Sequence, residues 1–131
     1  MELPKTRSGS DRPLLSVVDD DESVRESLPD LLKEFGFAVQ SFKSGEEFLA
    51  SRYLDQTKCV ILDIAMPGMS GFDVQRELTG RNRPIPVVFI TAQRDENAWS
   101  KRLRDNAVAC LLKPFSDTDL LHAIRTALRM E

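Results

Sequence analysis

The sequence predicts an α/β fold with a doubly wound parallel sheet of five strands and five helices. Five short apolar segments alternate with amphipathic segments along the chain of 131 residues, which is an ordinary length for one domain. Several of the apolar segments lack polar alternation, as expected of strands covered on both faces. Strict alternation of this kind favours right-handed crossovers with helices on both faces of the sheet.

The five predicted strands share β-branched and other apolar residues and are bounded by polar or turn-forming segments. In chain order they are LLSVV (14–18), FAVQSF (37–42), KCVILD (58–63), PVVFI (86–90) and VACLLK (108–113).

The first predicted helix lies between the first two strands. Apolar residues recur at helical spacing from 24 to 35 and would form one buried face. Pro29 falls inside this pattern and is expected to kink the helix or weaken one turn. Gly36 follows as the expected C-terminal stop.

Four further helices follow the same logic. Ser44 and Glu47 resemble a capping box at the start of the second helix. Residues 71–79 and 95–104 predict two shorter helices, and 117–130 predicts the last one.

Composition narrows the functional classes. The net charge of −3 gives no reason to expect direct nucleic-acid binding or attraction to an anionic membrane. No segment reaches the roughly 18 apolar residues of a membrane span, and no signal peptide is evident, so a cytoplasmic location is expected. Cys59 and Cys110 lie in apolar runs and are expected to be buried thiols. Residues 1–12 are expected to be a flexible tail and 13–131 the folded domain.

Charged and hydroxyl side chains gather where the predicted strands end. Because the carboxyl ends of parallel strands share one edge of the sheet, these groups should converge there. They are Asp19, Asp20 and Asp21 after the first strand, Asp63 after the third, Thr91 after the fourth and Lys113 after the fifth. Clustered carboxylates favour a hard divalent cation such as Mg²⁺ or Mn²⁺. One aspartate could then accept a phosphoryl group as an acyl phosphate.

Four motifs resemble the receiver domain of two-component response regulators. They are VVDDDESVRESL, VILDIAMPGMSG, VVFITAQ and LLKPF, and the likeness runs from about Leu14 to Met130. The nearest group is that of nitrogen-fixation regulators, whose receivers precede helix-turn-helix output domains that control transcription. The resemblance implies the strand order 2-1-3-4-5 and a sensor histidine kinase as phosphoryl donor.

The resemblance also implies a role for each residue of the acidic cluster. Asp63 resembles the phosphoacceptor, and Asp20 the direct ligand of Mg²⁺. Asp19 resembles the partner that holds metal-bound water, and the backbone carbonyl of Ala65 would complete the protein's share of the ligands. Asp21 would be a neighbour rather than a ligand.

Further positions would respond to phosphorylation. Thr91 resembles the switch hydroxyl, and Lys113 the lysine that pairs with the phosphoryl group, before a cis bond to Pro114. Trp99 and Cys110 would belong to a surface for output or for homodimerisation on phosphorylation. Cys110 departs from the family, which commonly has Tyr or Phe there.

The residues offer three alternatives to this hypothesis, and the third of them fails. A receiver-shaped module that binds its partner constitutively is suggested by Cys110. A small-molecule phosphatase is disfavoured because Ala65 stands where that class has a second acid. An EF-hand is disfavoured because Val24 stands where the loop needs glycine. The resemblance implies a switch that catalyses only its own phosphorylation and dephosphorylation, and the sole histidine, His122, is expected at the surface.

Overall fold

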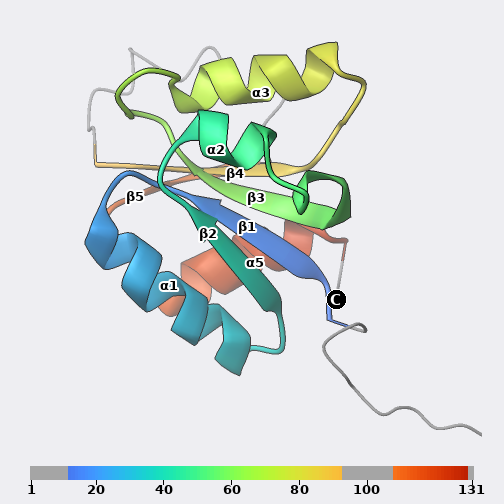
Figure 1. The fold of residues 1–131 in the computed structure, drawn as a ribbon. Coiled ribbons are helices and arrows are strands. Elements are labelled where there is room, and N and C mark those ends of the chain that lie inside the picture. Colours follow the sequence, from blue (N-terminus) through green and yellow to red (C-terminus); the bar gives the residue numbers. More distant parts are fainter. Residues whose placement is uncertain (1–11, 93–107, 130–131) are drawn as a thin grey trace, which may run out of the picture.

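The computed structural model describes residues 12–92 and 108–129, which form a five-stranded parallel sheet with helices on both faces (Figure 1). The elements in chain order are β1 (Leu14–Val18), α1 (Glu22–Glu34), β2 (Ala38–Phe42), α2 (Gly45–Leu49), the 3₁₀ turn η2 (Leu54–Gln56), β3 (Thr57–Asp63), α3 (Gly71–Gly80), β4 (Val87–Thr91), β5 (Ala109–Leu112) and α5 (Asp117–Ala127). The predicted helix over 95–104 lies outside the described residues.

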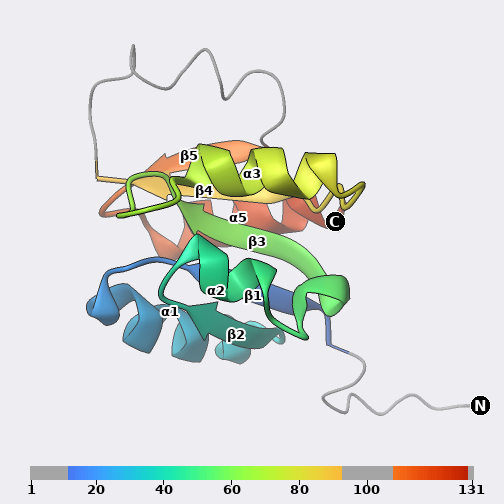
Figure 2. The same ribbon diagram turned by 45° about the horizontal axis from the view of Figure 1, so that its top comes forward.

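The sheet has the order β2-β1-β3-β4-β5, which confirms the predicted topology. Figure 2 shows β3 between β1 and β4. Each neighbouring pair of strands is parallel. All five residues of β4 are buried, so its uninterrupted apolar sequence matches a strand covered on both faces.

Two apolar layers sandwich the sheet. One lies between the sheet and the helices α2 and α3, and it contains Phe48, Phe72 and Phe89. The other lies beneath α1 and α5 and contains Leu32 and Ile124. Figure 1 shows the two pairs of helices on opposite faces of the sheet. This packing holds the strand ends in fixed register, and the site depends on that register.

The ends of α1 follow from its sequence. Asp21 caps the helix, because its carboxylate accepts the Ser23 backbone N–H at 2.9 Å. Gly36 ends it with φ of 99°, while the Phe37 N–H donates to the Leu32 carbonyl at 3.2 Å, completing a Schellman motif. The predicted stop at Gly36 is therefore confirmed. The helix continues through Pro29 without a break.

The later helices also begin at side-chain caps. Ser44 accepts the Glu47 N–H at 3.1 Å, but the Glu47 carboxylate accepts the N–H of Lys43 rather than that of Ser44. The predicted capping box is therefore present only in its first half. A reciprocal box does occur at α3, between Ser70 and Asp73. Within residues 12–92 and 108–129, no helix combines the length and hydropathy that a membrane span requires.

Candidate functional site

Three carboxylates meet at the carboxyl edge of the sheet. β1 and β3 pair with Val18 opposite Leu62, so the next residues, Asp19 and Asp63, fall side by side. Asp19, Asp20 and Asp63 each place one carboxylate oxygen within 4.8 Å of the others. Asp19 is fully buried and Asp63 is 4% exposed, whereas Asp20 faces solvent. The cluster therefore opens to water on one side.

Lys113 supplies positive charge to this cluster. Its Nζ lies 2.8 Å from Asp19 Oδ2 and 3.8 Å from Asp63 Oδ1. Burial lowers the pKa of Lys113, but the hydrogen bond to Asp19 and the charges of Asp63 and Asp19 outweigh it, so the pKa is raised. The ammonium is therefore held in its charged form. The peptide bond from Lys113 to Pro114 is cis, as the resemblance implied.

Asp63 carries an unfavourable charge in the absence of a cation. Its pKa is raised to about 7, first by burial and then by the neighbouring charge of Asp19, while Lys113 acts in the opposite direction. Three carboxylates against one ammonium leave an excess of negative charge. An oxygen-only donor set with one open side fits a hard divalent cation such as Mg²⁺.

Backbone contacts fix Asp19 in place. Its Oδ1 accepts the Asp21 N–H at 2.9 Å, and its carbonyl accepts a hydrogen bond from the Arg25 guanidinium at 2.9 Å. Asp21 itself caps α1, so its carboxylate serves the helix. Sequence reasoning missed Arg25. Arg25 lies one helical turn after the N-cap residue, and a side chain at that position points back toward the start of the helix. This spacing could have indicated its contact with Asp19.

The turn after β3 packs tightly on Asp63. The Gly71 N–H donates to the Ile64 carbonyl at 2.9 Å, and a Cβ on Gly71 would lie 2.6 Å from the Asp63 carbonyl oxygen. Gly71 is the first residue of α3. Its lack of a side chain also permits this close approach to the candidate acceptor. Ala65 lies exposed in the same loop.

Substituting Gly71 with alanine is expected to lower the free energy of unfolding by about 1–3 kcal/mol, because the new methyl group meets backbone that must shift. Urea denaturation would measure the change. Gly80→Ala is the matched control in the same helix, because an added Cβ there meets nothing within 4 Å. A Gly71→Ala protein as stable as Gly80→Ala would contradict the packing argument.

The remaining predicted positions lie as follows. Thr91 is fully buried at the end of β4, next to Leu112 of β5 in the register. Trp99 lies outside the described residues.

Cys59 is buried as expected, but Cys110 is only partly buried, which corrects the prediction for it. The reason is that β5 is the edge strand of the sheet. His122 is exposed, as expected.

The cysteine thiols are not activated. Burial raises the pKa of Cys59 to about 12 and that of Cys110 to about 11. Nucleophilic chemistry at neutral pH needs the thiolate, so the carboxylate cluster is the stronger candidate site.

Known proteins resemble this chain in sequence and in fold. The model of the response regulator receiver domain matches residues 15–125. Nodulation protein W of Bradyrhizobium diazoefficiens is 41% identical over 118 residues, which cover 90% of this chain and 52% of that protein. The structure of the response regulator StyR superimposes with a TM-score of 0.83 at 43% identity, covering 90% of this chain and 60% of that one.

The crystal structure of FixJ-N also matches, with a TM-score of 0.79 and 35% identity over 88% of this chain and 93% of that one. The chain spans about half the length of the curated relatives it matches, for example 55% of the response regulator TodT from Pseudomonas putida. Family model, relatives and fold thus agree on one class of protein. The chain belongs to the family of response regulator receiver domains.

Proposed function

We propose that this receiver accepts a phosphoryl group on Asp63 and thereby switches a surface that controls transcription. The observation that carries the proposal is the convergence of Asp19, Asp20 and Asp63 with Lys113 at one edge of the sheet. The donor is a phosphohistidine of a sensor histidine kinase, or a small acyl phosphate. Both the kinase and the cytoplasm as the site of action are expectations from the family.

The transfer is a substitution at phosphorus. A carboxylate oxygen of Asp63 attacks, a P–O bond forms, and the bond from phosphorus to the donor breaks, so that a mixed anhydride results. The donor leaves with the electron pair and takes up a proton if it is an imidazole. Mg²⁺, held by Asp20, Asp63 and the backbone carbonyl of Ala65, would neutralise charge on the transferred oxygens.

Lys113 and Thr91 supply the protein's remaining contacts. The Lys113 ammonium already lies 3.8 Å from Asp63 Oδ1, so a short movement away from Asp19 brings it to a phosphoryl oxygen. Thr91 stands at the end of β4, the neighbour of β3 in the sheet, and its hydroxyl would bind a second oxygen. Asp19 keeps Lys113 nearby until the phosphoryl group arrives.

The switch would reach the surface through β4 and β5. Thr91 pairs with Leu112, the residue before Lys113, so a shift of either side chain pulls on both strand ends. Phosphorylation would then shift an equilibrium toward a surface that includes Cys110 on β5, with homodimerisation as its outcome. Cys110 is partly buried there and would have to serve in place of an aromatic ring.

Intact-mass measurement after incubation with acetyl phosphate tests the acceptor. Wild-type protein is expected to gain about 80 Da, the mass of one phosphoryl group, only when Mg²⁺ is present. Asp63→Asn should gain nothing, because the amide cannot form the anhydride. Asp55→Asn, which alters an exposed carboxylate paired with Arg83, is the control and should be modified like the wild type. An unmodified wild-type protein with an intact fold would refute the proposal.

A further inference from the structure

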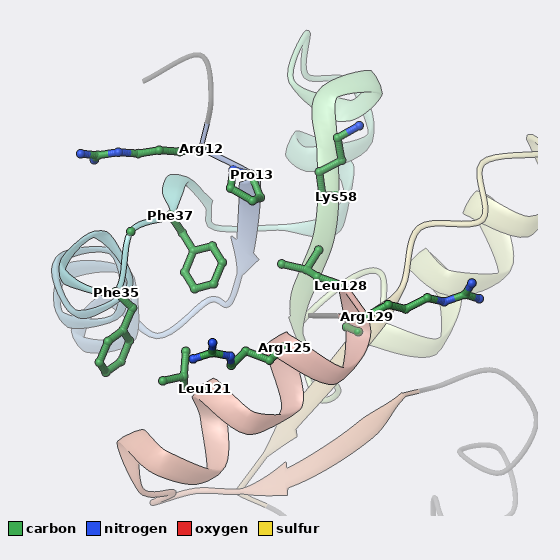
Figure 3. A pocket seen from close by; sticks show the side chains of 11 residues that line it. Arg12, Pro13, Phe35, Phe37, Lys58, Leu121, Arg125, Leu128 and Arg129 are labelled. Carbon is green, nitrogen blue, oxygen red and sulfur yellow. The ribbon is translucent and has the colours of Figure 1, made fainter. Parts of the chain in front are cut away.

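A pocket opens at the opposite edge of the sheet from the carboxylate cluster (Figure 3). We call it the basal pocket. It lies between the end of α1 (Phe35, Gly36 and Phe37), the segment before β1, the start of β3 and the last turns of α5, and its volume is about 920 Å³. This is within the range of pockets that bind ligands.

The basal pocket combines an apolar floor with a cationic rim. Phe37 and Leu128 contribute to the floor, and Phe35, at 40% exposure, stands open beside it. Four cationic side chains line the pocket, and none of its described lining residues is Asp or Glu; the cations are Arg12, Lys58, Arg125 and Arg129. In Figure 3, Arg125 extends toward Leu121 and Phe35, while the side chains of Arg12, Lys58 and Arg129 point away from Phe37 and Leu128.

Helix ends explain only part of this charge. Cations near a helix C-terminus are favourable, which accounts for Arg125 in the last turn of α5 and for Arg129 just beyond it. Lys58 and Arg12 belong to strand starts rather than to a helix end, and the chain as a whole carries a net charge of −3. Among the described residues, neither Lys58 nor Arg129 takes part in a salt bridge.

The backbone at Arg129 adds a second observation. Arg129 has φ of 58°, in the left-handed region that favours glycine at the position after a helix. A long cationic side chain therefore stands at a backbone position that glycine would occupy with less strain. This is consistent with a role for the charge itself.

The kind of anion follows from the local geometry. Both helices that reach the basal pocket, α1 and α5, end there, so they present backbone carbonyl groups to it. The free N–H groups that bind phosphate occur at the N-terminus of a helix, and neither helix places that end at the pocket. The cations stand on three separate segments around an apolar floor. A ligand with several spaced carboxylates and a bulky apolar side chain fits this pattern better than one compact anion.

We infer that the basal pocket is a docking site for an acidic amphipathic peptide segment of a partner protein. One or two large apolar side chains of the peptide would enter between Phe35 and Leu128, and its carboxylates would pair with Lys58, Arg125 and Arg129. Because the site lies at the edge opposite Asp63, the inference does not depend on phosphorylation.

A short synthetic peptide of Glu, Leu and Phe, with the apolar residues at helical spacing, is the probe. Titrated into the ¹⁵N-labelled protein, it should bind saturably and shift amide signals of residues 35–37, 58 and 121–129. The same peptide with Lys in place of Glu should bind at least about tenfold more weakly, since charge complementarity selects the partner. Equal binding of both peptides would overturn the inference.

Variants locate the site. Lys58→Glu, which changes the net charge by as much as the control Arg76→Glu, should weaken binding of the acidic peptide by about tenfold or more. Arg76→Glu, which alters a side chain 72% exposed on α3, should stay within about twofold of the wild type. Equal losses in both variants would mean that the peptide responds to overall charge, and the docking site would be rejected.

Two competing occupants are covered by the same titration. Displacement of the peptide by tripolyphosphate, with tighter binding on the same residues, would assign the basal pocket to phosphate compounds instead. Signal shifts of these residues that grow with protein concentration alone would assign it to a second copy of the chain. Either result would refute the peptide assignment.

Discussion

Replacing Lys113 with methionine is expected to lower the free energy of unfolding by about 3 kcal/mol in Mg²⁺-free buffer at pH 8. The substitution leaves Asp19, which is fully buried, without the ammonium that lies 2.8 Å from it. Asp63 would lose the opposing charge at 3.8 Å in the same step. An uncompensated buried carboxylate is costly, so the effect should exceed that of an ordinary surface substitution.

Thermal and urea denaturation would measure this loss, and the melting temperature should fall by about 10 °C. Saturating Mg²⁺ should reduce the difference, because a bound cation replaces part of the missing positive charge. Lys113→Met/Asp19→Asn should recover much of the stability, since the buried charge is then removed together with its partner. A Lys113→Met protein that unfolds like the wild type in EDTA would show that the pair contributes little.

The Mg²⁺-free protein is also expected to lose stability as the pH rises from about 4 to about 7, through Asp63. Its folded-state pKa is raised to about 7 from the ordinary value of 3.8, so the folded form keeps a proton that the unfolded form releases. Any stability tied to that proton is fully present below pH 4 and is lost as the pH approaches 7. The full difference corresponds to about 4 kcal/mol, and about 2 kcal/mol is expected after relaxation of the site.

Asp63→Asn should therefore be more stable than the wild type at pH 8 in EDTA, and the gap should narrow toward pH 4. Denaturation curves collected across this range would show it. Asp30→Asn, which changes an exposed carboxylate on α1, is the control and should keep the wild-type decline. Addition of Mg²⁺ should raise the melting temperature of the wild type far more than that of Asp63→Asn. If the difference in the free energy of unfolding between Asp63→Asn and the wild type did not change with pH, the electrostatic description of the site would be contradicted.

Much of the fold could be predicted because local patterns and global topology agree. The apolar run ending at Asp63 is buried throughout apart from Lys58, so its composition alone identified a strand covered on both faces. Gly36 ended the first helix where its conformational freedom is needed. The predicted strand 37–42 is too long by one residue at its start, and the predicted strand 108–113 is too long by one residue at each end. The ends of a strand depend on its pairing with neighbouring strands, which the sequence pattern does not show.

The sequence predicted hydrogen-bond partners and side-chain burial less accurately than it predicted the strands and helices. The capping box at Ser44 closed on a different backbone N–H than expected, because Glu47 reaches Lys43. Cys110 is only half-buried, because strand order places β5 at the edge of the sheet. Neither outcome is encoded in the spacing of the residues alone.

The sequence by itself determined which chemical groups end each strand, and therefore that carboxylates, a hydroxyl and an ammonium would share one edge. Parallel strands place their carboxyl ends together whatever the details of packing. Only the tertiary structure decided that Lys113 bonds Asp19 more closely than Asp63, that Arg25 holds the Asp19 carbonyl, and that Gly71 must lack a side chain. Each of these features depends on the distance between two residues that are remote in sequence or that the start of a helix brings together. Those distances follow from how the layers pack. The basal pocket likewise exists only because α1 and α5 end beside the starts of β1 and β3.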